Sequence, residues 1–234
     1  MMSLPVQVLE ISGVDAAAFA HAQFCNDVLA LADGHWQWNA WLSPQGRVRA
    51  FFRLRRVDAT RIVLDLHGGD AEWLRAELLH FVFRAKVQLR AANEATPGPA
   101  PEYSPLADIR AGIPEIGVEL RDRLLPQWIG LDRLGAVSVN KGCYPGQEIM
   151  ARLHFKGGNK RSLYRLRWAG DSLVPPGTPL RGANDGESGL VVMAAHDSHD
   201  GSVEALASLA DGTAGDLRLE SSPERAIGIV QHFD

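Results

Sequence analysis

The segment NKGCYPGQE, residues 140–148, gathers residue types that could do chemistry. It holds Cys143, one of only two cysteines in the chain, two positions after Lys141. The proline and glycine that follow favour a helix starting at Gln147, so we expect Cys143 just ahead of a helix N-terminus. An ammonium group and a helix N-terminus both stabilise a thiolate, which is the nucleophilic form of cysteine. Glu148, in the first turn of the expected helix, opposes this effect.

Two interpretations of Cys143 are open from the residues alone. The thiol is either presented for reaction or packed as a small apolar side chain in a tight turn. The glycines and the lysine around it favour the first. The other cysteine, Cys25, lies in an alanine-rich segment without basic neighbours, and we expect it in the core. A catalytic Cys–His pair would need folding to bring in a distant histidine, the candidates being His154, His196, His199 and His232.

Basic residues gather around two glycines just after the motif. Such a loop could bind a carboxylate or phosphate, and a solvated connection fits it equally well. The chain has no GxxxxGK[ST], no GxGxxG after a strand, no HExxH and no CxxC. Nucleotide hydrolysis, dinucleotide binding and zinc sites are therefore unsupported, and we expect no metal. The basic residues of the loop are Arg152, His154, Lys156, Lys160 and Arg161.

The composition is that of an ordinary globular protein, with 234 residues, 46% of them hydrophobic and 22% charged. A net charge of −4 argues against a broad nucleic-acid surface. Two cysteines fit a reducing compartment and are too few for the four thiolates of an iron–sulfur cluster. We find no signal peptide and no apolar stretch long enough for a membrane span, so we expect a cytoplasmic protein.

The elements expected to position the motif begin with an α+β layer. Alternating and amphipathic patterns give the order strand, helix, three strands, helix, strand. This order predicts helices on one face of a mainly antiparallel sheet. The strands are expected over 6–13, 36–42, 47–57, 61–67 and 86–90, and the helices over 14–29, with Asp15 as N-cap, and 70–85.

The rest of the chain suggests a linker and a second domain. Residues 91–105 hold four prolines and a glycine and read as a linker. A short helix is expected over 106–114, and residues 125–155 read as loop, strand, glycine-rich turn and helix. Later, short apolar runs separated by glycine and proline predict a small β-barrel or sandwich. We therefore predict two domains, 1–160 and 161–234.

The strand predicted over 47–57 has one apolar and one cationic face. Its even positions from 48 to 54 are apolar, whereas arginines occupy most odd positions from 47 to 55. A solvated outer face is the common arrangement for such a charge run. An anion-binding wall is the alternative, and the residues leave both open.

The octapeptide KGCYPGQE resembles the K-G-C-[FY]-x-G-Q-E signature of the YgfZ family, folate-binding proteins related to the glycine-cleavage T-protein, an aminomethyltransferase. The similarity extends through AGIPEIG and LPQWIGLDRLGAVSVNKGCYPGQEIMARLHFKGGNKRSLYRL, most of residues 111–166. ISGVDAAAFAHAQFCNDV, LSPQGRV and FVFRAKVQL also fit the opening unit of that family. The resemblance covers most of the chain.

This resemblance implies a ferredoxin-like, T-protein-like folate-binding domain followed by a small barrel. It implies binding of tetrahydrofolate or a one-carbon derivative. It also implies a role in making or repairing iron–sulfur enzymes, including those that methylthiolate tRNA. Client iron–sulfur enzymes are then the expected partners, without direct nucleic-acid or membrane binding.

The family's key positions fall on Lys141 and Cys143, the latter as functional thiol. A reduced pterin needs an aromatic wall and its glutamate tail needs cations, roles that suit Tyr144, Arg152 and Lys156. The folate-contact candidates are thus Lys141, Tyr144, Gln147, Glu148, Arg152 and Lys156.

Two departures from the family pattern stand out. Only residues 91–105 replace the family's middle αβ unit, so the folate cavity is open, rebuilt by a second copy of the chain, or absent. Aminomethyltransferases also carry an acidic residue just after the hairpin glycine, whereas residues 47–55 hold no carboxylate. With no acid there to assist C–N cleavage, we do not expect aminomethyltransferase activity.

Three functions follow from these observations. We favour a folate-binding accessory protein that uses Cys143 without classical enzymatic turnover. The alternatives are a folate-dependent one-carbon transferase and a non-enzymatic interaction module that has lost folate binding.

Overall fold

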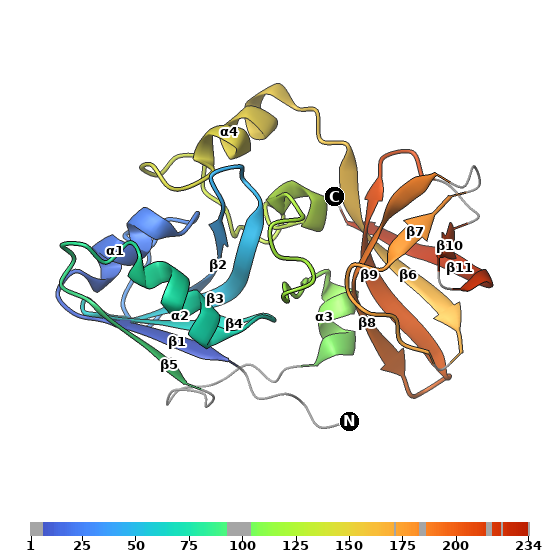
Figure 1. Ribbon diagram of the computed structural model, residues 1–234, viewed down its shortest axis with the longest axis horizontal. Coiled ribbons are helices and arrows are strands. Elements are labelled where there is room, and N and C mark those ends of the chain that lie inside the picture. The colour runs from blue at the N-terminus through green and yellow to red at the C-terminus, as the bar shows by residue number, and fades with distance from the viewer. Residues whose placement is uncertain are drawn as a thin grey trace. The chain divides into compact units, whose positions relative to one another are not determined.

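The computed structural model describes residues 7–92, 104–170, 172–182, 186–213, 217–220 and 222–233 (Figure 1). The chain divides into two compact units, each described here by itself. The first unit takes its residues from 1–103, 116–123 and 134–157, and the second from 104–115, 124–133 and 158–234. A domain boundary at residue 160 stays a prediction, and most of the predicted linker lies outside the described residues.

The first unit contains a five-stranded sheet in the order β2-β3-β4-β1-β5, and each described pairing is antiparallel. Two helices cover one face of this sheet (Figure 1). The predicted α+β layer is confirmed, with its order of elements. The elements are β1 (Val8–Ser12), α1 (Ala16–Gln23), β2 (Trp36–Leu42), β3 (Val48–Asp58), β4 (Arg61–Leu66), α2 (Ala71–Leu79) and β5 (Gln88–Ala92).

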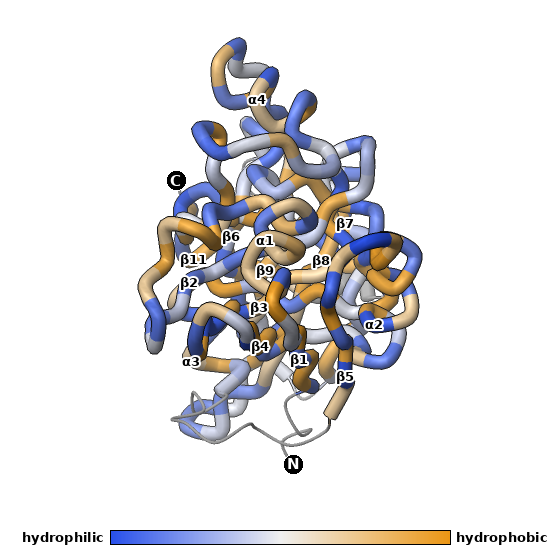
Figure 2. Tube along the Cα trace, turned by 90° about the vertical axis from the view of Figure 1, so that its left-hand side faces the viewer, coloured by the Kyte–Doolittle hydropathy of each residue, from blue (hydrophilic) through white to orange (hydrophobic). Residues whose placement is uncertain are grey.

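Alternation along the strands builds the core beneath these helices. Phe52 and Leu54 of β3 and Leu64 of β4 are fully buried, together with Leu74 and Leu78 of α2. In Figure 2 strands β1 and β4 are largely coloured as hydrophobic. Each such side chain contributes about 1.5–3 kcal/mol when removed from water, so this layer is a firm support for the loops at its edge.

Helix α1 is shorter than predicted and ends at Gln23. The next residues leave the helix because other partners take their backbone groups, and the N–H of Cys25 donates to Ala40 of β2 at 3.0 Å. Cys25 is therefore not in a helix, although its predicted burial is confirmed. Asp15 stands at the N-cap position, but its carboxylate accepts from the N–H of Lys86 rather than capping α1.

Helix α2 also ends early, at Leu79 rather than near residue 85. Its start is well defined, because the carboxylate of Asp70 accepts from the N–H groups of Glu72 and Trp73.

Three arginines of β3 are paired with carboxylates rather than freely solvated. Arg53 is buried and its guanidinium lies 3.0 Å from the carboxylate of Asp65, which Arg55 also contacts at 3.0 Å. Arg49 pairs with Glu77 at 3.0 Å. The carboxylates of Asp65 and Glu77 come from other elements and belonged to neither interpretation. Anion binding by these arginines stays a prediction.

The second unit is a closed barrel in the order β10-β11-β6-β9-β8-β7, which confirms the predicted β-barrel. Helix α3 packs against β8 and β9, starts at a Ser104 cap and ends at Gly112 in a left-handed conformation. The elements are α3 (Pro105–Ala111), the 3-10 helix η1 (Pro126–Ile129), β6 (Arg161–Ala169), β7 (Pro179–Arg181), β8 (Glu187–Asp197), β9 (Ser202–Ala210), β10 (Leu217–Leu219) and β11 (Ser222–Phe233). Within the described ranges, no helix is long and apolar enough to cross a membrane.

The predicted strand ahead of the motif is absent from the described residues, because residues 136–140 form an irregular segment. Ser138 is held there by single hydrogen bonds, with its N–H donating to the carbonyl of Cys25 at 2.9 Å. The predicted helix after the motif is confirmed as α4 (Gln147–Lys156).

Candidate functional site: an exposed thiol loop and an adjoining hollow

The motif loop, residues 141–147, places Cys143 at the protein surface. The side chain is exposed, and within the described residues it makes no hydrogen bond. Burial as a small packing residue is therefore ruled out for Cys143. A reagent or partner could reach this sulfur without any rearrangement of the loop.

Lys141 points into the protein and ties the loop to the end of α1. Its ammonium donates to the carbonyls of His21, Phe24 at 2.5 Å and Asn26 at 3.4 Å. These carbonyls lie at and just beyond the helix C-terminus, where a cation is favourable. Burial lowers the pKa of Lys141 to about 8. The three carbonyls account for the position of the ammonium group, so the structure gives Lys141 a loop-anchoring role.

Tyr144 and Gln147 close the loop from the other side. The Tyr144 hydroxyl donates to the carbonyl of Ser138 at 3.1 Å, and its buried ring lies 5.0 Å from the Lys141 ammonium. The Gln147 amide donates to the carbonyl of Lys141 at 3.1 Å. Three residues of the motif thus hold the loop, and the cysteine between them is left outside.

The remaining predicted folate contacts are exposed on helix α4. Glu148, Arg152 and Lys156 face solvent along this helix, beside Phe155, which is 71% exposed. The structure therefore does not bring the six predicted contacts together. Three belong to the motif loop and three to the open face of α4.

A glycine joins the motif loop to the hairpin between β2 and β3. Gly146 has a φ of +82°, and a β-carbon built on it would lie 2.6 Å from the carbonyl oxygen of Ser43 and 2.9 Å from the Cα of Gly46. Gly46 closes the hairpin turn with a φ of +73°. Its N–H donates to the carbonyl of Ser43 at 2.8 Å. The two segments meet backbone to backbone, which requires glycine at residue 146.

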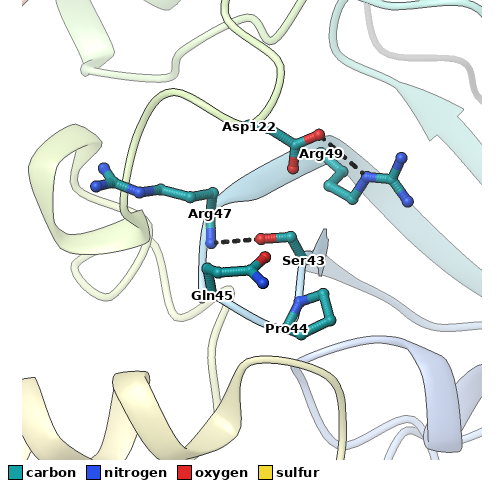
Figure 3. Close-up of a pocket in the computed structure, with 6 residues that line it drawn as sticks. All are labelled: Ser43, Pro44, Gln45, Arg47, Arg49 and Asp122. Carbon is teal, nitrogen blue, oxygen red and sulfur yellow. Dashed lines mark hydrogen bonds and ion pairs between the residues drawn. The ribbon is translucent and has the colours of Figure 1, made fainter.

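The same hairpin forms one wall of a hollow of about 560 Å³. Figure 3 shows Asp122 beside Arg49, with its carboxylate 3.4 Å from the Arg49 guanidinium. Cys143 does not line this hollow, which adjoins the motif through Ser43 and Gly146. The lining residues are Ser43, Pro44, Gln45, Arg47, Arg49 and Asp122.

Asp122 stands in the hollow in an unusual backbone conformation. Its φ is +59°, the left-handed region, and its N–H donates to the carbonyl of Val48 at 3.0 Å. Strained positions of this kind are enriched at functional sites. Asp122 supplies the carboxylate that residues 47–55 lack. Sequence reasoning missed it because it arrives from a different segment.

A second residue that sequence reasoning missed is His21. A β-carbon built on Gly142 would lie 3.9 Å from its Nε2, and its Nδ1 lies 3.3 Å from the Asp27 carboxylate. Burial, and then the charge of Lys141, lower the pKa of His21, so the imidazole is neutral at pH 7. No spacing in the sequence pointed to this contact.

The fold places the chain in a known structural class. The crystal structure of glycine cleavage system aminomethyltransferase T from Bartonella henselae matches it with a TM-score of 0.65. That match covers 97% of this chain and 83% of the other, at 14% identity, so the T-protein-like fold is shared. No family model matches the chain.

Sequence relatives point to one group of proteins. The chain is 40% identical over 123 residues to the tRNA-modifying protein YgfZ of Sodalis glossinidius, covering 51% of this chain and 37% of that protein. It is 40% identical over 90 residues to YgfZ of Cronobacter sakazakii, covering 37% and 27%. An uncharacterized protein of Haemophilus influenzae is 26% identical over 194 residues, covering 68% and 69%. The predicted resemblance to the YgfZ proteins is confirmed.

The matches to the YgfZ proteins are partial. The chain spans between 27% and 38% of the length of the four YgfZ relatives compared. Activity, ligand and partners of the whole relatives therefore enter only as proposals.

Proposed function

We propose that this chain is a YgfZ-type, folate-binding accessory protein that supports iron–sulfur enzymes, tRNA-modifying ones among them, through the thiol of Cys143. The observation that supports this proposal most is that three side chains of the motif loop anchor it while the thiol is exposed. Lys141, Tyr144 and Gln147 hold the loop with their side chains, whereas the side chain of Cys143 is exposed and has no partner in the described residues. An inert packing cysteine would not need such a frame.

The folate part of the proposal concerns the hollow beside the motif loop. The ligand is tetrahydrofolate or a one-carbon derivative. The proposed site is the hollow lined by Arg47, Arg49 and Asp122, which adjoins the loop through Gly146. Arg152 and Lys156 remain proposed contacts for the glutamate tail. The hollow offers a second cationic surface for the same task.

Complementation tests the role of Cys143. A strain that lacks its own YgfZ protein should regain methylthiolated tRNA when it expresses the wild-type chain, and should not regain it with Cys143→Ala. Because Cys143 is exposed and makes no hydrogen bond, this variant should melt at the wild-type temperature. Equal restoration by both chains at equal expression would refute the role of the thiol.

Asp122 supports a second candidate function, a folate-dependent one-carbon transferase. It places a carboxylate in the hollow beside the hairpin, where the absence of an acid from residues 47–55 had argued against such chemistry. Its carboxylate lies 3.4 Å from the Arg49 guanidinium. Transfer from an aminomethyl donor to tetrahydrofolate, abolished by Asp122→Asn, would favour this candidate. Absence of transfer by a chain that binds tetrahydrofolate would exclude it.

The third alternative, an interaction module without folate binding, makes the opposite prediction in a titration. It expects no heat with tetrahydrofolate and direct association with a client iron–sulfur enzyme.

A further inference from the structure

Arg121 presents a guanidinium group whose hydrogen-bond donors are unused. Its Cζ lies 3.2 Å from the centre of the Trp73 ring, so the indole face supports it. Its Nε is buried and has no hydrogen-bond partner, and no other donor of Arg121 has one within the described part of the chain. Buried polar groups are almost always paired, so the buried Nε of Arg121 indicates a missing acceptor.

A second guanidinium shares the same indole. Arg49, which lines the hollow, places its Cζ 5.2 Å from the centre of Trp73 and 4.3 Å from that of Trp41. Burial, and then the charge of Arg49, lower the pKa of Arg121. Two like charges held on a rigid aromatic surface favour an anion between or beside them.

The acidic neighbours of Arg121 do not satisfy it. Glu77 and Asp122 are paired with Arg49, at 3.0 Å and 3.4 Å. The carboxylate of Asp70 accepts from backbone N–H groups at the start of α2. None of these three carboxylates accepts a hydrogen bond from Arg121, so its planar fork of donors remains available for a ligand.

We propose that Arg121, supported by Trp73 and flanked by Arg49, binds a carboxylate of a small molecule that occupies the adjoining hollow. A stacked guanidinium is a bidentate receptor for a carboxylate, which a lysine cannot reproduce. Under the proposed function this group is a carboxylate of the folate's glutamate tail, and that identity rests on the proposed function. The carboxylate site itself does not.

Titration calorimetry on the full chain tests this site with three probes. p-Aminobenzoylglutamate carries the tail without a pterin, 6-methyltetrahydropterin carries the pterin without a tail, and inorganic phosphate is an anion with neither. The wild-type chain should bind p-aminobenzoylglutamate. Arg121→Gln should weaken that binding at least tenfold, the scale of losing a charge-assisted, bidentate contact, and leave 6-methyltetrahydropterin unaffected.

Two further variants make the result specific. Arg121→Lys keeps the positive charge but loses the planar pair of guanidinium donors. This variant should therefore also bind p-aminobenzoylglutamate more weakly than the wild-type chain. Arg90→Gln removes an exposed cation of β5 that has no part in any proposed contact, and it should leave the affinity unchanged. Thermal unfolding checks that each variant is folded.

The outcomes separate this site from the folate proposal. Binding of phosphate or p-aminobenzoylglutamate that depends on Arg121, without any binding of 6-methyltetrahydropterin or tetrahydrofolate, supports the carboxylate site and counts against folate. Unchanged binding in Arg121→Gln, equal weakening by Arg90→Gln, or no binding of any anionic probe overturns the site.

Discussion

The carbonyl oxygen of Ser43 lies against Gly146, so closely that a β-carbon on Gly146 would stand 2.6 Å from it. Real β-carbons do not come this near to an oxygen. The contact fixes the start of α4 on the hairpin that lines the hollow. It explains physically why the motif has a glycine at this position, three residues after the exposed thiol.

Replacing Gly146 with alanine should destabilise the fold strongly. The new methyl group would collide with the hairpin, and the left-handed backbone would also disfavour alanine. We expect a loss of about 2–4 kcal/mol in the free energy of unfolding, measured by urea titration.

Gly130→Ala is the matched control for this change. Gly130 also has a left-handed conformation, with φ +69° and ψ +25°, but a β-carbon there would meet nothing closer than 3.5 Å. The Gly130→Ala variant should lose only about 1 kcal/mol in the free energy of unfolding. Equal losses in the two variants would show that the contact with Ser43 is unimportant.

Replacing Lys141 with methionine should loosen the motif loop. The carbonyls of His21, Phe24 and Asn26 would lose their shared donor, at a cost of about 2–3 kcal/mol in unfolding free energy. Lys156→Met, on the exposed end of α4, is the control and should change stability by less than about 0.5 kcal/mol. A Lys141→Met protein with the unfolding free energy of the wild-type chain would contradict the anchoring role.

Stability should fall with rising pH because of Glu115 in the second unit. Burial raises the pKa of this carboxyl to about 7, and its Oε1 is buried without a hydrogen-bond partner. Between the ordinary value of 4.5 and about 7, the folded chain holds a proton that the unfolded chain has lost. Its contribution to stability is therefore complete below that interval and is lost as the pH rises through it.

Glu115→Gln isolates this effect, because glutamine stays neutral. At pH 8 the variant should be more stable than the wild-type chain by about 2 kcal/mol, and the difference should shrink at pH 4.5. Urea titrations at the two pH values measure it. Parallel pH profiles for the two chains would mean that Glu115 ionises normally in the folded protein.

Much of the fold could be predicted from local patterns. Alternate residues of β3, namely Ala50, Phe52 and Leu54, enter the core, and Pro44 with Gly46 marks the hairpin turn. The predictions failed where a residue far away in the sequence forms a hydrogen bond with a backbone group. Helix α1 stops at Gln23 because Ala40 and Lys141 bind the residues after it, and neither partner is visible in the helix's own sequence.

The candidate site was only partly predictable for the same reason. The motif favoured an exposed cysteine before a helix, because its lysine, glycines and proline influence the backbone and the thiol through neighbours in the sequence. Asp122, His21 and Arg121 join the site from other segments, and their side chains matter through contacts that folding creates. The carboxylate partners of the charge run on β3, Asp65 and Glu77, also lie on other elements.

Alkylation of the native chain with iodoacetamide, followed by mass spectrometry, probes the display of the thiol. Cys143 is exposed, whereas Cys25 has no exposed surface and burial raises its pKa to about 12. We expect one adduct, on Cys143, with Cys25 modified only after denaturation. Absence of labelling in the native chain, or a first adduct on Cys25, would contradict a motif loop built to present Cys143.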